Sequence, residues 1–398
     1  MSKRAANDEA QSSLQAKRVK RTQTDGHATG CSDPECDGCD VGEIEISFVK
    51  KNSQGQEEPA TPSARELLAM AIEEAADSGS NCEDDNKSGE KSELVKRLFG
   101  MALEQFKEKE PEDRLGYAIC LVELGKAVCV EESIREGLDL LRHLNKKEPS
   151  LETMLCLARA AFALATFLRT RQNQWFKDER QELDEEDEKE YAQLLKKHKV
   201  SKEEIKLCKE GLEAAGKMVE QKDNAAPSRE QRSSLHDIYD YIQLLDEHIN
   251  FDHANLIINT TMNMVKQFRY LEDYDLLALL AALLLQKQRV LSDDPEGKET
   301  KILCLEAKNY LVEARKLYSD KHNKEYAWGW ELHALASLVL SNVLEDEDKV
   351  LESFDEALEA FKKALELNPE NKHVAEMIEM LQGSPENDVD KEDEKTEM

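Results

Sequence analysis

The sequence predicts an all-α fold: a degenerate tetratricopeptide-like helical-repeat solenoid with a disordered N-terminal arm and an acidic C-terminal tail. The strongest sign is the run over residues 351–371. Its small, aromatic, small and helix-stop positions are occupied by Ala357, Phe361, Ala364 and Pro369. One such unit cannot bury its own apolar face, so further helical pairs are expected upstream.

The composition agrees with a helical stack. Only 16 Gly and 9 Pro interrupt 398 residues, while Glu, Lys, Leu and Ala are abundant. Aromatic residues make up 6% of the chain, which is little for one deep core and enough for a thin two-layer stack of helices.

Charge and cysteine usage limit the kinds of partner and compartment. The net charge of −30 argues against a general affinity for nucleic-acid backbones. We expect no signal peptide and no membrane span, since the longest apolar run, 276–285, is too short to cross a bilayer. In a reducing compartment the cysteines of the apolar helical patterns are expected to be free core residues. These are Cys120, Cys129, Cys156, Cys208 and Cys304.

Three segments are expected along the chain. Residues 1–62 lack a periodic apolar pattern and predict a disordered arm, in which the alternating stretch from Glu43 to Val49 is too short to form a sheet alone. Residues 63–382 predict the helical-repeat domain. Residues 383–398 hold seven acids and two lysines without an apolar face, which predicts a disordered tail.

In the first half of the domain, helices are expected over 65–75, 93–107, 115–130 and 151–169. Residues 115–149 fit a second repeat, whose packing positions are Leu124, Gly125, Gly137 and Pro149. The many alanines of 151–169 imply tight contact with two neighbouring helices. The acidic segment 177–189 is either a solvated helix or an insertion between pairs.

The second half continues the same pattern. A helix over 201–221 begins with a capping box in which Ser201 pairs with Glu204. Further helices are expected over 228–247, 251–269, 273–290, 299–317, 325–344, 349–367 and 373–381. The sum is about thirteen or fourteen helices and no credible sheet.

Two basic clusters in the arm match a bipartite nuclear import signal. An extended chain can lay both clusters into acidic pockets of an import carrier. The residues are Lys3, Arg4, Lys17, Arg18, Lys20 and Arg21. The alternative is an ordinary charged tail, but the clusters are an island of positive charge on an acidic protein.

The arm also contains four soft ligands within thirteen residues: His27, Cys31, Cys36 and Cys39. Such a set could hold zinc in a tetrahedron. Its spacing matches no standard zinc knuckle, and acidic residues are interleaved, so an exposed thiol cluster is the favoured interpretation and no metal or other cofactor is expected. His248 and His253 are interpreted as helix-end residues.

Trp328 and Trp330 flank Gly329 at a predicted helix start. Tryptophans in a solenoid often lock one helical pair on the next, and the alternative is a partner-binding hot spot. Phosphate loops, nucleophile elbows and zinc-protease motifs are missing from the sequence, so we do not expect an enzyme.

The whole layout resembles a fungal family named enhancer of translation termination, which also contains the nuclear negative regulator of a 2-oxoglutarate-dependent prolyl-hydroxylase-like protein. The shared features are the basic arm, the acidic helical body with Trp328-Gly329-Trp330, and the run from Ala357 to Pro369. The family tends to begin with Lys-Arg-Pro-Leu-Gly, where this chain has Lys3-Arg4-Ala5-Ala6. The resemblance implies a nuclear, non-enzymatic protein that binds an Fe(II)/2-oxoglutarate oxygenase-like protein or termination machinery.

The sequence thus favours a nuclear helical-repeat adaptor that binds and regulates a partner protein. The resemblance extends this to an influence on translation termination and transcription. The alternative is an acidic nuclear chaperone for basic clients such as histones, which the net charge, the segment 178–190 and the acidic tail support.

Overall fold

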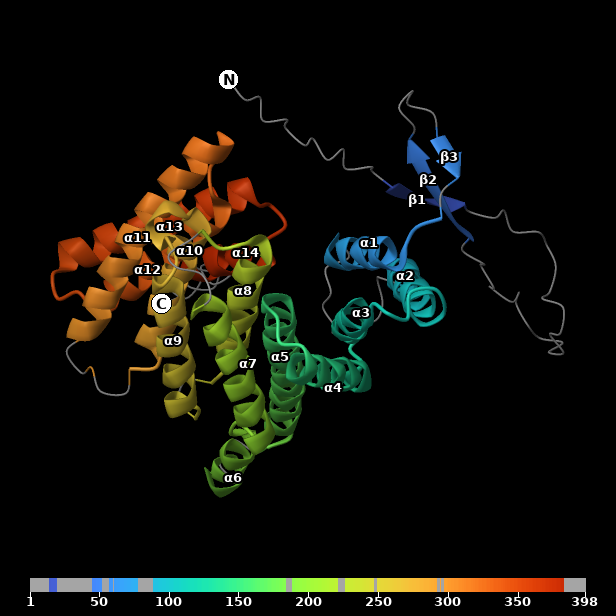
Figure 1. Cartoon of the computed structure of the whole chain (residues 1–398). Helices are drawn as coiled ribbons and strands as arrows, with labels where there is room; N and C mark the ends of the chain where they lie inside the picture. Colours follow the sequence, from blue (N-terminus) through green and yellow to red (C-terminus); the bar gives the residue numbers. More distant parts are fainter. Residues whose placement is uncertain are drawn as a thin grey trace, which may run out of the picture. The chain divides into compact units, whose positions relative to one another are not determined.

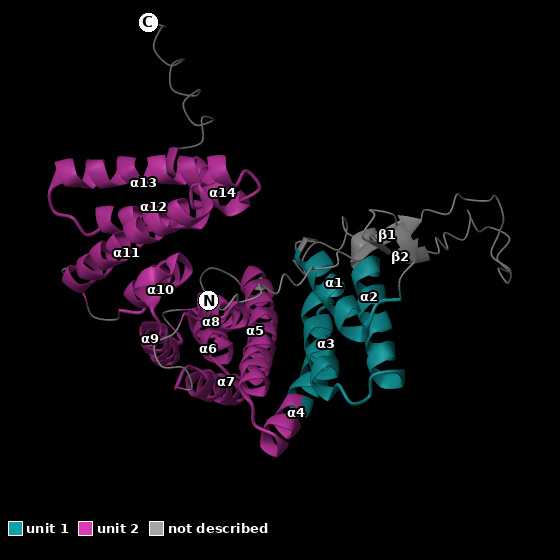
Figure 2. Ribbon diagram, turned by 45° about the horizontal axis from the view of Figure 1, so that its top comes forward, with its two compact units in different colours: residues 1–140 teal, residues 141–398 magenta. Residues whose placement is uncertain are grey.

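The computed structural model describes residues 14–19, 45–51, 57–59, 61–77, 89–183, 188–220, 226–246, 249–291, 294 and 297–382. α-Helices dominate these residues, and the all-α prediction is confirmed (Figure 1). The chain divides into two compact units, residues 1–140 and 141–398 (Figure 2). The division falls inside the predicted domain 63–382, whose limits stay a prediction.

A three-stranded antiparallel sheet precedes the helices (Figure 1). Its order is β1 (Leu14–Val19), β2 (Glu45–Lys51), β3 (Glu57–Pro59). Residues 45–49 of the alternating stretch therefore lie in a strand, and the expectation that the chain would form no sheet is wrong. Both partner strands come from segments without an apolar alternation, so the sequence pattern did not reveal them. Apart from residues 61 and 62, the rest of the predicted disordered arm lies outside the described residues.

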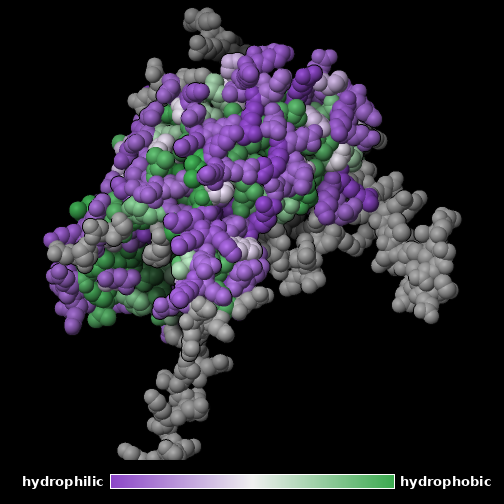
Figure 3. Space-filling model, turned by 90° about the horizontal axis from the view of Figure 1, so that it is seen from below, coloured by the Kyte–Doolittle hydropathy of each residue, from purple (hydrophilic) through white to green (hydrophobic). Residues whose placement is uncertain are grey.

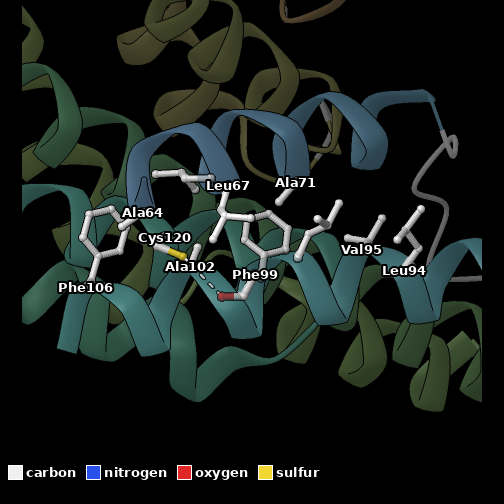
Figure 4. Packing of buried hydrophobic residues seen from close by; sticks show 11 residues of the cluster. Ala64, Leu67, Ala71, Leu94, Val95, Phe99, Ala102, Phe106 and Cys120 are labelled. Atoms are coloured by element: carbon white, nitrogen blue, oxygen red, sulfur yellow. Dashed lines mark hydrogen bonds between the residues drawn. The ribbon is translucent and has the colours of Figure 1, made fainter. Parts of the chain in front are cut away.

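Unit 1 contains α1 (Ala64–Asp77), α2 (Gly89–Glu108), α3 (Arg114–Ala127) and the first part of α4 (Glu131–Lys147). Its core joins Leu67 of α1, Phe99 and Phe106 of α2 and Cys120 of α3, all at most 2% exposed (Figure 4). The Cys120 thiol donates a hydrogen bond to the Phe99 carbonyl at 3.8 Å. Phe48 of β2 packs against this cluster.

Two glycines let α3 and α4 approach closely. A Cβ on Gly137 would lie 2.7 Å from Val122 Cγ2, and one on Gly125 would collide with Ile134 Cγ1. These are the glycines that the repeat pattern places at close-packing positions. Leu124 packs against the unit 1 core, and Pro149 lies between the end of α4 and the start of α5.

Unit 2 contains the rest of α4 and a stack in which most helices contact their first or second neighbours along the chain. Such local contacts are typical of helical repeats. The helices are α5 (Leu151–Glu182), α6 (Glu188–His198), α7 (Lys202–Glu220), α8 (Arg229–Gln243), α9 (Phe251–Lys266), η1 (Tyr270–Glu272), α10 (Tyr274–Arg289), α11 (Lys298–His322), α12 (Ala327–Ser341), α13 (Glu347–Leu367) and α14 (Lys372–Gln382). On the face shown in Figure 3, hydrophilic residues prevail and hydrophobic ones appear in separate groups.

The alanine-rich helix α5 packs against both α7 and α8, as its composition predicted. It runs to Glu182, thirteen residues beyond the predicted end at Arg169, and absorbs the first part of the acidic segment. By length and composition it is also apolar enough to cross a membrane, but 67% of that stretch is buried. Burial of this extent fits the core helix of a globular unit.

The predicted capping box at the start of α7 is confirmed. The Ser201 hydroxyl accepts a hydrogen bond from the Glu204 amide at 3.1 Å, and Glu204 Oε2 accepts one from the Ser201 amide at 2.8 Å. The Glu204 carboxylate also accepts hydrogen bonds from Nε and Nη2 of Arg169, each at 2.8 Å. This Arg169–Glu204 pair is buried, and the sequence pattern gave no sign of it.

The cysteines follow the expectation at four of the five positions. Cys120, Cys156, Cys208 and Cys304 are free. Burial raises the pKa of the Cys120 and Cys208 thiols to about 12, so both are inert core residues. Cys129 departs from the prediction, because it is disulfide-bonded and adopts a positive φ of 55° just after α3 ends.

Candidate partner-binding site

The connection between α11 and α12 brings together the aromatic residues of the candidate site. α11 ends at Asn323, whose left-handed conformation (φ 52°) stops the helix, as asparagine often does at this position. Residues 324–326 then return the chain to α12, which contacts α11. The turn therefore places the last turn of α11 beside the first turn of α12.

Eight aromatic side chains lie around this turn, and we call them the aromatic cluster. They are His236, Tyr239, Tyr274, Tyr318, His322, Tyr326, Trp328 and Trp330, from α8, α10, α11, α12 and the connection itself. Tyr318 stacks on Tyr326 with ring centroids 4.6 Å apart, and Tyr274 meets Tyr318 edge-on at 4.9 Å. Stacked and edge-to-face contacts of this kind fix the orientation of the rings.

The two predicted tryptophans are both in the cluster but face different neighbours. Trp328 contacts the rings of His236 and Tyr239 on α8, with centroids 5.5 and 6.3 Å away. Trp330 lies under the Arg315 guanidinium and packs against the buried cluster of α13 and α14. Each tryptophan thus connects α12 to a neighbouring helix, and each remains partly exposed.

Two hollows open beside these rings. One, of about 460 Å³, is lined by Tyr318, Lys324, Glu325, Tyr326, Ala327, Trp328 and Leu367. The other, of about 290 Å³, is lined by Val312, Arg315, Ser319, Glu325, Tyr326 and Trp330. Tyr326 and Glu325 border both, so the two hollows adjoin. Partly buried aromatic walls around a concave surface are the usual form of an anchor site for a protein partner.

Charged groups around the cluster are held by partners. Glu325 accepts from Lys363 of α13 at 2.9 Å, and Glu356 accepts from both Lys308 and His333, at 2.6 and 2.7 Å. Asp275 accepts from His236 at 3.0 Å. Burial lowers the pKa of His236, but this hydrogen bond and the charges of Asp275, Asp240 and Asp237 outweigh it, so the pKa lies above its ordinary value.

The repeat positions of the C-terminal run lie on α13, which packs against α12, and in the turn that follows it. Ala357, Phe361 and Ala364 are buried between α13 and its neighbours, and Pro369 lies in the turn before α14. Phe361 is fully buried in a cluster with Ala334, Ala360, Ala364 and Val374, against which Trp330 packs. The repeat core thereby supports the floor of the candidate site.

Most of the predicted arm sites lie outside the described residues. This applies to Lys3, Arg4, Lys20 and Arg21 of the import signal and to His27, Cys31, Cys36 and Cys39. Lys17 and Arg18 are in β1, where they pair with Ser47 and Ile46 of β2. The part of the chain that the structure describes contains no group of three or more potential metal ligands. His248 also lies outside it, whereas His253, near the start of α9, lies 3.3 Å from the Tyr241 hydroxyl.

Sequence reasoning selected Trp328 and Trp330 and missed most of the cluster. Tyr274, Tyr318 and His236 come from helices far apart in the sequence, and single aromatic residues in amphipathic helices are ordinary core candidates. Arg315 gave no signal either, because charged residues occur throughout α11. Three tyrosines and a histidine within residues 310–326 are a concentration that could have indicated the site.

Of the comparisons with known proteins, only the one with solved structures finds proteins similar to this chain. No protein family model matches the chain, and no curated protein matches it. Two crystal forms of the S. pombe nuclear import adaptor Nro1 align at 12% identity. Their TM-scores are 0.39 and 0.42, over 80% and 82% of this chain and 99% and 100% of theirs.

A third solved structure belongs to Nro1 described as a hypoxic regulator of sterol synthesis and a nuclear import adaptor. It aligns at 13% identity with a TM-score of 0.40, over 80% of this chain and 94% of its own. These values are too low to assign a function. None of the three is described as an enhancer of translation termination, so that family stays a hypothesis based on sequence resemblance.

Proposed function

We propose that this chain is a non-catalytic nuclear adaptor that binds a partner protein through the aromatic cluster of unit 2. The observation that carries the proposal is the pair of adjoining hollows walled by Tyr318, Tyr326, Trp328 and Trp330. Trp, Tyr and Arg are the residues that dominate the binding energy of protein interfaces, and rigid rings lose little entropy when a partner docks. Ring contacts hold Tyr318, Tyr326 and Trp328 in place before binding, and the Arg315 guanidinium lies over Trp330.

The sequence resemblance supports a finer proposal. The partner would be a 2-oxoglutarate-dependent oxygenase-type factor or part of the termination machinery, and the adaptor would influence translation termination and transcription by holding it. Occupancy is the mechanism: a bound partner is sequestered, blocked or escorted. A stack of helices whose contacts are local suits this role, because it offers a long surface and needs no catalytic group.

Replacing Trp328 with Ala should reduce partner recovery at least tenfold in affinity purification from native cells. The indole forms a wall of the larger hollow, and truncating an aromatic anchor typically costs about 2 kcal/mol or more of binding free energy. Mass spectrometry of the captured proteins measures the effect. Trp175→Ala is the matched control, since Trp175 lies on α5 outside the cluster.

Thermal unfolding of both variants separates lost binding from lost folding, because Trp328 also packs on α8. Equal recovery of every protein by wild type and Trp328→Ala would rule out the aromatic cluster as the partner site. Recovery of an oxygenase or of release factors would favour the finer proposal.

Deleting residues 1–21 should move a fluorescent fusion from the nucleus to the cytoplasm. The deletion removes the whole basic signal, Lys3 and Arg4 together with the cluster at 17–21. Confocal imaging measures the nuclear fraction. The control replaces Lys50 and Lys51 with Gln, which removes two positive charges outside the signal and should leave the fusion in the nucleus. Unchanged nuclear accumulation after the deletion would contradict the import signal.

An acidic chaperone for basic clients such as histones is the second candidate. The net charge of −30 favours it. Salt separates the two functions, because attraction between exposed charges is screened over about 8 Å at physiological ionic strength. A histone client should dissociate in moderate salt, whereas a partner packed on the aromatic cluster should largely remain bound.

A further inference from the structure

One arginine beside the aromatic cluster differs from three other arginines of unit 2. Arg142, Arg159 and Arg169 of unit 2 each face a carboxylate within 2.8 Å. Arg315 instead lies over the Trp330 ring, 3.8 Å from its centroid. Among the described residues it makes no hydrogen bond and no ion pair, and its Nη1 is buried without a hydrogen-bond acceptor. A guanidinium without an acceptor is unusual in so acidic a chain.

The position of this guanidinium is built into the helix pair. A Cβ on Gly329 would lie 2.9 Å from Arg315 Cγ and 2.8 Å from Tyr326 Cδ1, so the glycine leaves room for the arginine stem against α12. The indole below then fixes the plane of the guanidinium. Burial lowers the pKa of Arg315, because its charge has lost water without gaining a bonded acceptor.

The hollow at Arg315 suits a small anionic group. Its volume of about 290 Å³ is bounded by Val312, Ser319, Tyr326 and Trp330 besides the arginine and Glu325. The two nearest carboxylates are already engaged, Glu325 with Lys363 and Glu356 with Lys308 and His333. Neither neutralises Arg315 by direct contact, so no carboxylate of the described residues occupies its donors.

We propose that Arg315 and Trp330 receive a carboxylate side chain of the partner, presented on a peptide segment that enters the smaller hollow. This inference rests on the proposed function and names the group that the partner contributes. A planar guanidinium matches a carboxylate through two parallel hydrogen bonds. A singly charged carboxylate also suits the site better than a phosphate, because Glu325 and Glu356 repel a double charge more strongly. Val312 and Tyr326 would contact the apolar residues beside the carboxylate.

Two blocked pentapeptides test the proposal, Ala-Leu-Glu-Leu-Ala and its twin with Gln in place of Glu, each carrying a fluorescent label. Anisotropy titration into the full chain should show the Glu peptide binding at least tenfold more tightly. In Arg315→Gln the two peptides should bind equally. In Arg315→Lys the preference should shrink, since an ammonium keeps the charge and loses the two-pronged geometry.

Arg171→Gln is the matched control, because Arg171 of α5 also lies near an aromatic ring, that of Phe167, and its loss changes the net charge equally. It should keep the full preference for Glu. The proposal is overturned by equal binding of the two peptides to wild type, by binding of neither, or by a preference that survives Arg315→Gln. Tighter binding of a phosphoserine peptide would overturn the choice of carboxylate.

Two further outcomes distinguish a failure of the carboxylate assignment from a failure of the proposed adaptor function. If removing residues 383–398 tightens binding of the Glu peptide, the chain's own acidic tail is the occupant, and the assignment to a partner is overturned. If Trp328→Ala abolishes recovery of the partner but Arg315→Gln keeps the preference for Glu, the adaptor function stands and the carboxylate assignment alone fails.

Discussion

Replacing Phe361 with Ala is expected to lower the free energy of unfolding by about 3–5 kcal/mol. The ring is fully buried between α12, α13 and α14, among Ala334, Ala360, Ala364 and Val374. The fully buried residues around it are mostly alanines, whose short side chains cannot fill the vacated space, and larger, partly buried side chains such as Leu338 and Ile378 complete its surroundings. The substitution therefore loses the transfer free energy of the ring and also leaves a cavity.

Urea unfolding followed by circular dichroism measures this loss. Phe354→Ala is the matched control, because Phe354 lies on the same helix but is only partly buried, so its loss should be clearly smaller. An unchanged unfolding midpoint in Phe361→Ala would contradict the packing of the C-terminal repeat. A loss as large in Phe354→Ala would show that the ring's burial is not what matters.

Replacing Glu204 with Ala is expected to cost about 3–5 kcal/mol as well, for an electrostatic reason. Its partner Arg169 is fully buried. Nε and Nη2 of Arg169 donate hydrogen bonds to Glu204, and Nη1 donates one to the His198 carbonyl at 2.8 Å. Without Glu204 the guanidinium would be buried with one acceptor left. The same change also removes the carboxylate that caps the Ser201 amide at the start of α7.

The helix α7 supplies its own control for this prediction. Glu210 makes a two-pronged pair with Arg142 at 2.8 and 2.6 Å, but the two side chains are 24% and 35% exposed. Water can replace such a partner, so Glu210→Ala should cost about 0–1 kcal/mol. Equal losses in the two variants, measured by urea unfolding, would show that burial does not govern the strength of these pairs. Replacing Arg169 and Glu204 together by Met and Leu should recover much of the loss.

Features that depend on local sequence patterns were predictable, and features that depend on contacts between separate segments were not. The helices were predictable because the 3.6-residue apolar period and the caps are local, as at Ser201 and Glu204. The close approach of α3 and α4 at Gly125 and Gly137 was readable for the same reason, since the repeat spacing carries it. The sheet was not, because β1 and β3 have no apolar alternation of their own and acquire their structure by pairing with β2.

The candidate site was predictable only in part, for a related reason. Trp328 and Trp330 stand out as rare residues at a helix start. Tyr274 and Tyr318 join them through contacts between helices, which leave no mark on the local pattern. The solitary guanidinium of Arg315 is less visible still, because it is defined by the absence of an acceptor among the described residues around it.

The complete burial of the central part of α10 affects how any mutational scan of this protein should be interpreted. Every residue from Leu276 to Leu285 is buried, with α8, α9, α11 and α12 packed around it. Such a segment presents no outward surface, so none of its side chains can touch another molecule in the folded state. A defect in partner recovery caused by a substitution there reports damaged architecture, and it should never be counted as a recognition phenotype.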